Sequence, residues 1–242
     1  MQANEVLRLE SGGVLPLYVP PKTVRGVVLI CPGGGYQWVA PREGEPVARA
    51  FNAGGWAAAV LEYTCYQGKP LGKLPLKQAG EAMHVLRQRF ADMPALTCGF
   101  SAGGHLAASA ATMLPEEVRP AFAVLVYPVI TAEPGKCHKG SFDNLLGTDR
   151  TAGDEAQWSL QNRVTASTPP TLLLIADDDR TVPPVNSTLF YEALKRNGVK
   201  GCSLRIYPSG GHGGGFNPDR IYRTAWRADV LDWLGTLPNS AS

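Results

Sequence analysis

The sequence predicts an α/β fold whose mostly parallel central sheet is covered by helices on both faces. Three observations lead to this prediction. The 242 residues are 44% hydrophobic and only 18% charged, a composition that can fill a substantial core. Apolar runs of strand length alternate along the chain with segments of helical character, as they do in folds built on a parallel sheet. The runs are continuously apolar, which is typical of strands buried on both faces.

The expected elements alternate along the whole chain. The run 24–31 is rich in β-branched residues and stops at the turn-forming residues 32–35, which indicates a buried strand followed by a loop. Over 76–90 the apolar residues recur at helical spacing, which predicts an amphipathic helix. The other expected strands are 56–63, 97–100, 121–127, 171–176 and 203–207. The other expected helices are 46–52, 103–113, 186–197 and 221–234.

Residues 131–170 contain no clear strand, and we interpret them as an insertion of loops and short helices over the sheet edge. The chain has no internal repeat and no low-complexity linker, and its length suits one α/β domain. The sequence therefore predicts a single domain over residues 1–242 that carries this insertion.

Composition and charge argue against several classes of function. The formal net charge is only +2 and the basic residues are scattered, so no nucleic-acid partner is expected. No apolar stretch approaches the roughly 18 residues of a membrane span, and the first residues lack the pattern of a secretory signal. The 5 cysteines form no CxxC pair, which favours reduced thiols in a cytoplasmic protein. The histidines lack metal-binding spacing, so neither a metal nor another cofactor is expected.

A serine nucleophile is predicted at Ser101. Residues 99–103 match G-x-S-x-G and lie between a predicted strand and a predicted helix. Such a turn projects the serine oxygen above the sheet, and side chains in place of the glycines would clash with neighbouring backbone. The start of the helix also directs free backbone N–H groups, including that of Ala102, at a developing oxyanion.

A serine nucleophile needs a base within hydrogen-bond reach, and elimination among the 4 histidines favours His212. His84 lies within the amphipathic helix. His105 lies one turn into the helix of Ser101, where a packed, hydrogen-bonded histidine is expected. His138 lies in a loop beside two lysines and suits a solvated position. His212 follows the last strand among glycines, so its backbone has the freedom to carry the ring over a neighbouring strand end.

Three consecutive aspartates are candidates for the acid that orients this base. Asp177, Asp178 and Asp179 follow a predicted strand and lie between the serine and the histidine, the chain order that accompanies a G-x-S-x-G nucleophile. The Val-Pro pair at 182–183 ends the loop and begins the next helix, which favours Asp179, and Asp178 remains the alternative. The aspartates that do not serve as the acid would bond local backbone N–H groups.

The glycines at 33–35 directly follow the first buried strand. Three glycines let the backbone approach an oxyanion closely, whereas a phosphate-binding loop would continue as G-x-G-x-x-G or G-K-[ST]. Together with Ser101 this segment resembles the HGGG-type oxyanion loop of carboxylesterases. Pro32 stands here in place of the histidine, an exchange that leaves the backbone donors intact.

The chain as a whole resembles the small α/β-hydrolase esterases known as acetylxylan or carbohydrate esterases, near the hormone-sensitive-lipase branch. The resemblance covers most of the chain. It rests on PGGGY (32–36), EGEPVAR (43–49), GFSAGGHLAA (99–108), YPVI (127–130), NLLG (144–147), TPPTLLL (168–174), DxxVPxxNS (179–187) and YPSGGHG (207–213).

This resemblance implies an α/β-hydrolase fold with a catalytic triad of Ser101, Asp179 and His212. The implied oxyanion donors are Gly34, Gly35 and Ala102. The implied activity is that of a serine carboxylesterase, which would remove acetyl groups from acetylated sugars or xylo-oligosaccharides. Four aromatic residues on loops near the predicted site are candidate substrate contacts: Tyr36, Trp38, Trp158 and Phe216.

Three other functions compete with the esterase. A peptidase of the prolyl-oligopeptidase type shares the fold, but such enzymes usually carry a large additional domain. An aryl-formamidase would apply the same triad to an amide. An inactive binding protein on a hydrolase scaffold is the third, and the three intact triad candidates speak against it.

Overall fold

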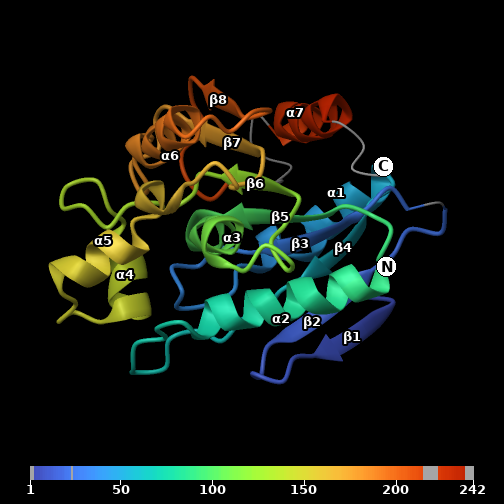
Figure 1. Ribbon diagram of the computed structural model, residues 1–242, viewed down its shortest axis with the longest axis horizontal. Helices are drawn as coiled ribbons and strands as arrows, with labels where there is room; N and C mark the ends of the chain where they lie inside the picture. The colour runs from blue at the N-terminus through green and yellow to red at the C-terminus, as the bar shows by residue number, and fades with distance from the viewer. Residues whose placement is uncertain (1–2, 23, 215–222, 238–242) are drawn as a thin grey trace.

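The computed structural model describes residues 3–22, 24–214 and 223–237, which form one eight-stranded sheet with helices on both faces (Figure 1). The strand order is β1-β2-β4-β3-β5-β6-β7-β8, and all pairs from β4 to β8 are parallel. The strands are β1 (Glu5–Arg8), β2 (Val14–Tyr18), β3 (Val27–Cys31), β4 (Ala57–Val60), β5 (Ala95–Phe100), β6 (Phe122–Val126), β7 (Thr171–Ala176) and β8 (Ser203–Tyr207). The predicted mostly parallel α/β fold is confirmed.

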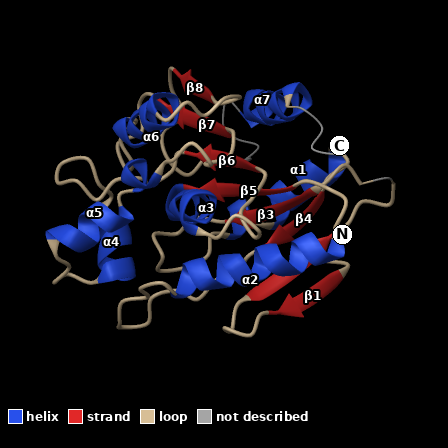
Figure 2. Ribbon diagram, in the orientation of Figure 1, coloured by secondary structure: helices blue, strands red, loops and turns tan. Residues whose placement is uncertain are grey.

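Helices cover both faces of this sheet, as the blue ribbons beside the red strands show in Figure 2. The α-helices are α1 (Glu45–Ala53), α2 (Leu74–Arg89), α3 (Ser101–Met113), α4 (Lys139–Leu146), α5 (Ala152–Trp158), α6 (Val185–Arg196) and α7 (Arg223–Thr236), and the 3-10 helices are η1 (Pro41–Glu43) and η2 (Leu160–Arg163). Side chains of α2, α3 and α6 pack in one core, and those of α1 and α7 pack in the other.

Strand β3 shows how one sequence supplies both cores. Its side chains alternate, so that Val27 and Leu29 enter the core under α3 while Val28 and Ile30 enter the core under α1. All of them are fully buried, which is why the strand is apolar at every position instead of at every second one.

The antiparallel hairpin of β1 and β2 has no counterpart among the predicted strands. Both strands are short and lie at one edge of the sheet, and β1 alternates between half-buried and exposed residues. Pro16 interrupts the apolar pattern of β2. The sequence signal for these strands is therefore weak, whereas the two strands pair in register from Glu5–Leu17 to Arg8–Val14.

In the region 131–170 the chain forms α4, α5 and η2 and contains no strand among its described residues. Within this region, the side chain of Arg150 links α4 to α5. Its Nη1 lies 2.6 Å from Asp143 Oδ1, and its Nε lies 2.9 Å from Glu155 Oε1. Helix η2 contacts both α3 and α6, so this segment lies beside the helix that follows the predicted nucleophile.

Within the described residues, no helix combines the length and the apolar character that a bilayer crossing needs.

Candidate active site

Ser101 lies at the carboxyl end of β5 and is the first residue of α3. Its φ is +52°, a left-handed conformation that few non-glycine residues adopt, as expected for a serine on a sharp strand-to-helix turn. A Cβ on Gly103 would lie 2.0 Å from the carbonyl oxygen of Cys31. The glycine after the serine therefore lets α3 approach the end of β3, which places Ser101 beside the glycine-rich loop.

His212 connects Ser101 to one of the three aspartates. Its Nε2 lies 2.9 Å from Ser101 Oγ, and its Nδ1 lies 2.7 Å from Asp179 Oδ2. Because a carboxylate only accepts, Nδ1 carries the ring proton and Nε2 is free to accept the serine proton. The three side chains come from the ends of β5, β7 and β8, in line with the rule that parallel sheets place their sites at the carboxyl ends of strands.

The surroundings of the aspartates separate Asp179 from its neighbours. Asp179 is 4% exposed, and its Oδ1 accepts hydrogen bonds from the N–H groups of Thr181 and Val182, both at 2.9 Å. Asp178 is exposed, and its Oδ1 accepts from the N–H of Gly211 at 2.8 Å. Asp179 thus holds the imidazole, while Asp178 holds the backbone of the histidine loop.

The glycine-rich loop after β3 turns through consecutive left-handed residues. The φ angles of Gly34, Gly35 and Tyr36 are +121°, +65° and +61°. The N–H of Gly33 donates to Glu43 Oε2 at 2.7 Å, whereas the N–H groups of Gly34 and Gly35 donate to no acceptor within the described part of the chain. Among the described residues the loop therefore offers two unpaired N–H donors beside the predicted nucleophile, as an oxyanion site requires.

A cavity of about 220 Å³ lies over Ser101. Beyond Ser101, Glu43 and His212, it is lined by Gly34, Gly35, Gln37, Trp38, Ala40, Arg42, His138, Thr181 and Gly213. Gln37, Arg42, His138 and Thr181 contribute polar side chains, although more of the lining surface is apolar than polar. Trp38 is 52% exposed. The cavity is therefore small and mixed in character, with polar side chains and one exposed aromatic residue.

His138 lines the cavity, although the sequence indicated no role for it in the site. It is half-buried instead of solvated, and its Nδ1 lies 2.8 Å from Ser141 Oγ at the start of α4. Burial and then the neighbouring His212 lower the pKa of His138, and Asp179 opposes them. The expectation of a solvated loop histidine is wrong, because the segment before α4 folds over the cavity.

Tyr36 and Trp158 contact His105, which corrects the prediction that these two residues contact the substrate. The Tyr36 O–H donates to His105 Nδ1 at 2.9 Å, and His105 Nε2 donates to the carbonyl of Trp158 at 3.0 Å. Burial lowers the pKa of His105 to about 4, so this ring is neutral. The two aromatic residues are 1% and 4% exposed, and neither lines the cavity over Ser101.

His105 has the packed, hydrogen-bonded role that its position predicts. Trp38 is the predicted aromatic residue that lines the cavity. Phe216, the fourth aromatic candidate, lies outside the described residues.

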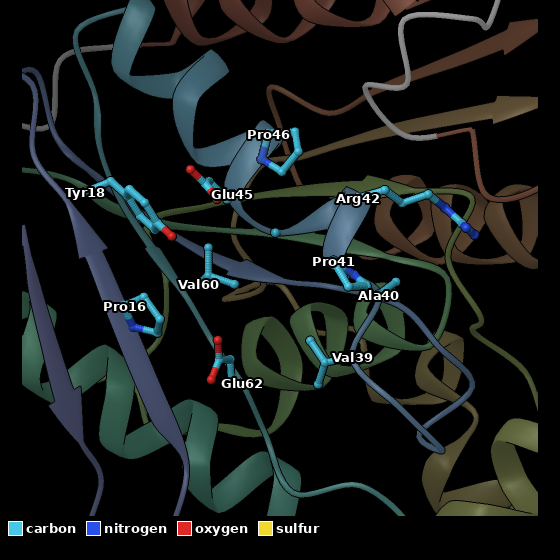
Figure 3. Close-up of a pocket in the computed structure, with 11 residues that line it drawn as sticks. Pro16, Tyr18, Val39, Ala40, Pro41, Arg42, Glu45, Pro46, Val60 and Glu62 are labelled. Atoms are coloured by element: carbon cyan, nitrogen blue, oxygen red, sulfur yellow. The ribbon is translucent and has the colours of Figure 1, made fainter. Parts of the chain in front are cut away.

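A second, larger hollow of about 710 Å³ lies next to this cavity, and Ala40 and Arg42 line both. Figure 3 shows Tyr18 and Val60 on one side of it, and the side chain of Arg42 extending away from them. Its described lining residues include neither Ser101 nor His212. The smaller cavity is therefore the candidate active site, because Ser101 and His212 meet there.

Comparisons with known proteins agree with this architecture. The chain is 34% identical over 230 residues to an acetylxylan esterase from Xylanibacter ruminicola, in an alignment that covers 91% of this chain and 48% of that protein. It is 33% identical over 235 residues to endo-1,4-beta-xylanase B from Butyrivibrio fibrisolvens, covering 88% of this chain and 36% of that protein. The chain thus spans half or less of the length of these two relatives.

A solved structure of an acetyl ester-xyloside bifunctional hydrolase from Caldicellulosiruptor lactoaceticus matches with a TM-score of 0.85 and 33% identity. That match covers 93% of this chain and 88% of the other. The family model of the prolyl oligopeptidase family matches residues 77–239, a range that includes Ser101, Asp179 and His212. The chain therefore belongs to the prolyl oligopeptidase family and has the α/β-hydrolase fold.

Proposed function

We propose that this protein is a serine esterase that removes acetyl groups from acetylated sugars, with Ser101 as nucleophile, His212 as base and Asp179 as the acid that orients the base. The observation that carries the proposal is the hydrogen-bonded chain from Ser101 through His212 to Asp179 beside a loop with two free N–H donors. A nucleophile, an oriented base and an oxyanion site are the parts that acyl transfer needs.

The proposed reaction has two halves. His212 Nε2 takes the proton from Ser101 Oγ as the oxygen attacks the ester carbonyl, and the carbonyl oxygen becomes an anion held by the N–H groups of Gly34, Gly35 and Ala102. The alcohol leaves with the proton that His212 returns, and an acetyl group stays on Ser101. Water, deprotonated by His212, then attacks this acyl-enzyme and releases acetate. Each donor contributes about 3 kcal/mol to the stability of the oxyanion.

The cavity and the relatives support a small acyl group on a hydroxylated alcohol. A cavity of about 220 Å³ suits an acetyl group and one sugar unit better than a long acyl chain. Gln37, Arg42, His138 and Thr181 offer hydrogen bonds to sugar hydroxyls, and the exposed indole of Trp38 offers an apolar face to a sugar ring. The names of the acetylxylan esterase and acetyl ester-xyloside hydrolase relatives point to the same substrate class.

Acetate release tests this proposal directly. The wild-type chain and Ser101→Ala are compared on acetylated xylo-oligosaccharides, p-nitrophenyl acetate and p-nitrophenyl butyrate. We expect acetate from the oligosaccharides, faster turnover of acetate than of butyrate esters, and loss of all activity in Ser101→Ala. Preference for butyrate or longer esters would contradict the acetyl specificity and leave the nucleophile standing.

Peptide and formamide hydrolysis are tested in the same panel. The family match includes peptidases by its description, so a prolyl-peptide p-nitroanilide is included beside N-formylkynurenine. Turnover of either substrate above that of the acetate esters would replace the esterase by the corresponding amidase with the same triad.

We further propose that the protein works in the cytoplasm. Cys31, Cys65, Cys98, Cys137 and Cys202 are all free thiols, which suits a reducing compartment. Fractionation of the source cells with an antibody against the protein tests this, and recovery in the extracellular fraction would contradict it.

A further inference from the structure

Glu43 is a buried carboxylate in the active-site cavity that the proposed reaction does not use. It is the last residue of η1, is only 2% exposed, and lines the cavity over Ser101. Buried acidic residues are rare unless their oxygens are hydrogen-bonded or paired. Both oxygens of Glu43 are occupied. Oε2 accepts from the N–H of Gly33 at 2.7 Å, and Oε1 accepts from the hydroxyl of Tyr127 at 2.8 Å.

The first of these partners belongs to the proposed oxyanion loop. A Cβ on Gly33 would lie 2.7 Å from Glu43 Oε2 and 3.0 Å from Ser101 Cβ, so this glycine is wedged between the carboxylate and the nucleophile. Its N–H donates to Glu43, and the next two N–H groups, those of Gly34 and Gly35, find no acceptor among the residues that the structure describes. The carboxylate therefore holds the point at which the oxyanion loop begins.

The second partner packs against the proposed base. Tyr127 follows β6 with a left-handed φ of +37°, and its ring centroid lies 4.8 Å from that of His212. Backbone in this region costs free energy for a non-glycine residue and persists where surrounding contacts fix it. The hydrogen bond to Glu43 is one such contact. Glu43 thus links the oxyanion loop on one side to the ring beside His212 on the other.

Burial and hydrogen bonding act in opposite directions on Glu43. Burial raises the pKa of Glu43, and the Gly33 N–H, the Tyr127 hydroxyl, Arg42 and His212 offset only part of this rise. Arg42 Nε lies 4.0 Å from Glu43 Oε1. The two hydrogen bonds therefore offset part of the cost of burying this carboxyl group.

We propose that Glu43 is a positioning residue for acyl transfer, which fixes Gly33 so that the Gly34 and Gly35 N–H groups face the oxyanion and holds the Tyr127 ring against His212. The inference rests on the proposed function in one respect, namely that Ser101 performs acyl transfer. It does not depend on which ester is the substrate.

The test compares Glu43→Gln with Glu45→Gln. The two substitutions remove the same charge two residues apart, but Glu45 is exposed, pairs with Arg49 and does not line the active-site cavity. A glutamine at position 43 has one accepting oxygen. When that oxygen accepts from Gly33, the Tyr127 hydroxyl can only accept from the amide NH₂, and when it accepts from Tyr127, the Gly33 N–H loses its partner. Three readouts are taken on the whole chain: the rate of Ser101 labelling by a fluorophosphonate, kcat and KM for p-nitrophenyl acetate, and the thermal midpoint.

We expect Glu43→Gln to lower kcat by about 10- to 100-fold with KM changed less than about threefold, because a positioned oxyanion donor acts mainly in the transition state. The labelling rate should fall in parallel. Glu45→Gln should leave the labelling rate, kcat and KM at wild-type values and lower the thermal midpoint only slightly, because it loses an exposed pair with Arg49. An unchanged kcat in folded Glu43→Gln would overturn the proposal.

Tyr127→Phe gives an independent measurement if Glu43→Gln does not fold. It removes the hydroxyl donor and keeps both oxygens of Glu43, so kcat should fall by about three- to tenfold. An unchanged kcat in this variant would contradict the positioning role. Failure of the proposed function has a different signature. If wild-type Ser101 is labelled but no acetyl ester is hydrolysed, the substrate is wrong and the effect of Glu43→Gln on labelling still decides the inference.

Discussion

Replacing Asp179 by asparagine tests the central geometry of the site, with Asp178→Asn as its matched control. The two residues are adjacent and the two substitutions remove the same charge. Only Asp179 contacts His212, with Oδ2 at 2.7 Å from Nδ1, whereas Asp178 bonds the N–H of Gly211. A role based on net charge near the site predicts equal losses for the two variants. A role based on orientation of the imidazole predicts very unequal ones.

The size of the Asp179→Asn effect follows from its three hydrogen bonds. An asparagine oxygen can still accept from the N–H groups of Thr181 and Val182, so the loop keeps its shape. Its NH₂ group would then face His212 Nδ1 and favour the tautomer with the proton on Nε2, which cannot accept the proton of Ser101. Asparagine at this place in a serine protease triad lowers kcat about 10⁴-fold. We expect a similar loss here, equivalent to about 5.5 kcal/mol of transition-state free energy.

For Asp178→Asn we expect kcat within about threefold of wild type, because the asparagine oxygen can still accept from the N–H of Gly211. Even complete loss of this exposed hydrogen bond would change the stability of the protein by about 1 kcal/mol or less. The assay is p-nitrophenyl acetate hydrolysis at saturating substrate, with thermal midpoints to show that both variants fold. Losses of equal size in the two variants, or less than about tenfold in Asp179→Asn, would refute the proposed orientation.

Three further substitutions test other parts of the site. In Gly34→Ala the new Cβ would lie 2.1 Å from the carbonyl oxygen of Trp38 at a φ of +121°, so we expect kcat to fall by about 100-fold or more as the loop shifts its donors, and wild-type turnover would contradict their role. The buried ring of His105 has its pKa lowered from 6.5 to about 4, so the unfolded chain binds the proton first and stability is lost as pH falls from about 6.5 to about 4. The free energy of unfolding, measured with urea across this range, should vary with pH by about 3 kcal/mol less in His105→Gln than in the wild type. An unchanged pH dependence would mean that the native ring binds its proton at the same pH as the unfolded chain does. In Trp38→Ala we expect KM for acetylated xylo-oligosaccharides to rise more than KM for p-nitrophenyl acetate. The free energy of unfolding should change by less than about 1 kcal/mol, because Trp38 is exposed. Equal effects on both KM values would exclude a sugar-binding role.

The fold and the proposed triad were accessible from the sequence because their signals are local. The buried strands of the parallel sheet are largely apolar runs, Ser101 directly follows one of them, and His212 lies among glycines in the loop after the last strand. Parallel strands end at one edge of a sheet, so residues at those ends meet even when 111 positions separate them, as in the His212–Ser101 bond. The choice between Asp178 and Asp179 stayed open, since it depends on which carboxylate turns toward the imidazole and both share the same local pattern.

The edge hairpin failed to appear in the sequence for the opposite reason. β1 has four residues, half-buried or exposed, and β2 has five residues with Pro16 at their centre, so each carries too few periods to stand out. Their pairing with each other and of β2 with β4 is what defines them. Tyr36 and Trp158 were misplaced because an aromatic residue in a loop looks the same whether it faces a substrate or a neutral histidine. Their burial around His105 is a property of the fold.

Glu43 shows most clearly what separates a predictable site residue from a hidden one. A glutamate just before a helix has an ordinary local explanation, since negative charge is favourable at a helix N-terminus. The neighbouring Glu45 fits that explanation, exposed and in the first turn of α1. The role of Glu43 is instead defined by Gly33, ten residues before it, and by Tyr127, 84 residues after it. No pattern within the segment distinguishes the two glutamates, and only the hydrogen bonds to Gly33 and Tyr127 make one of them part of the site. Residues that act at strand ends can therefore be found from sequence periodicity, while residues that brace them must be found from contacts between distant strands.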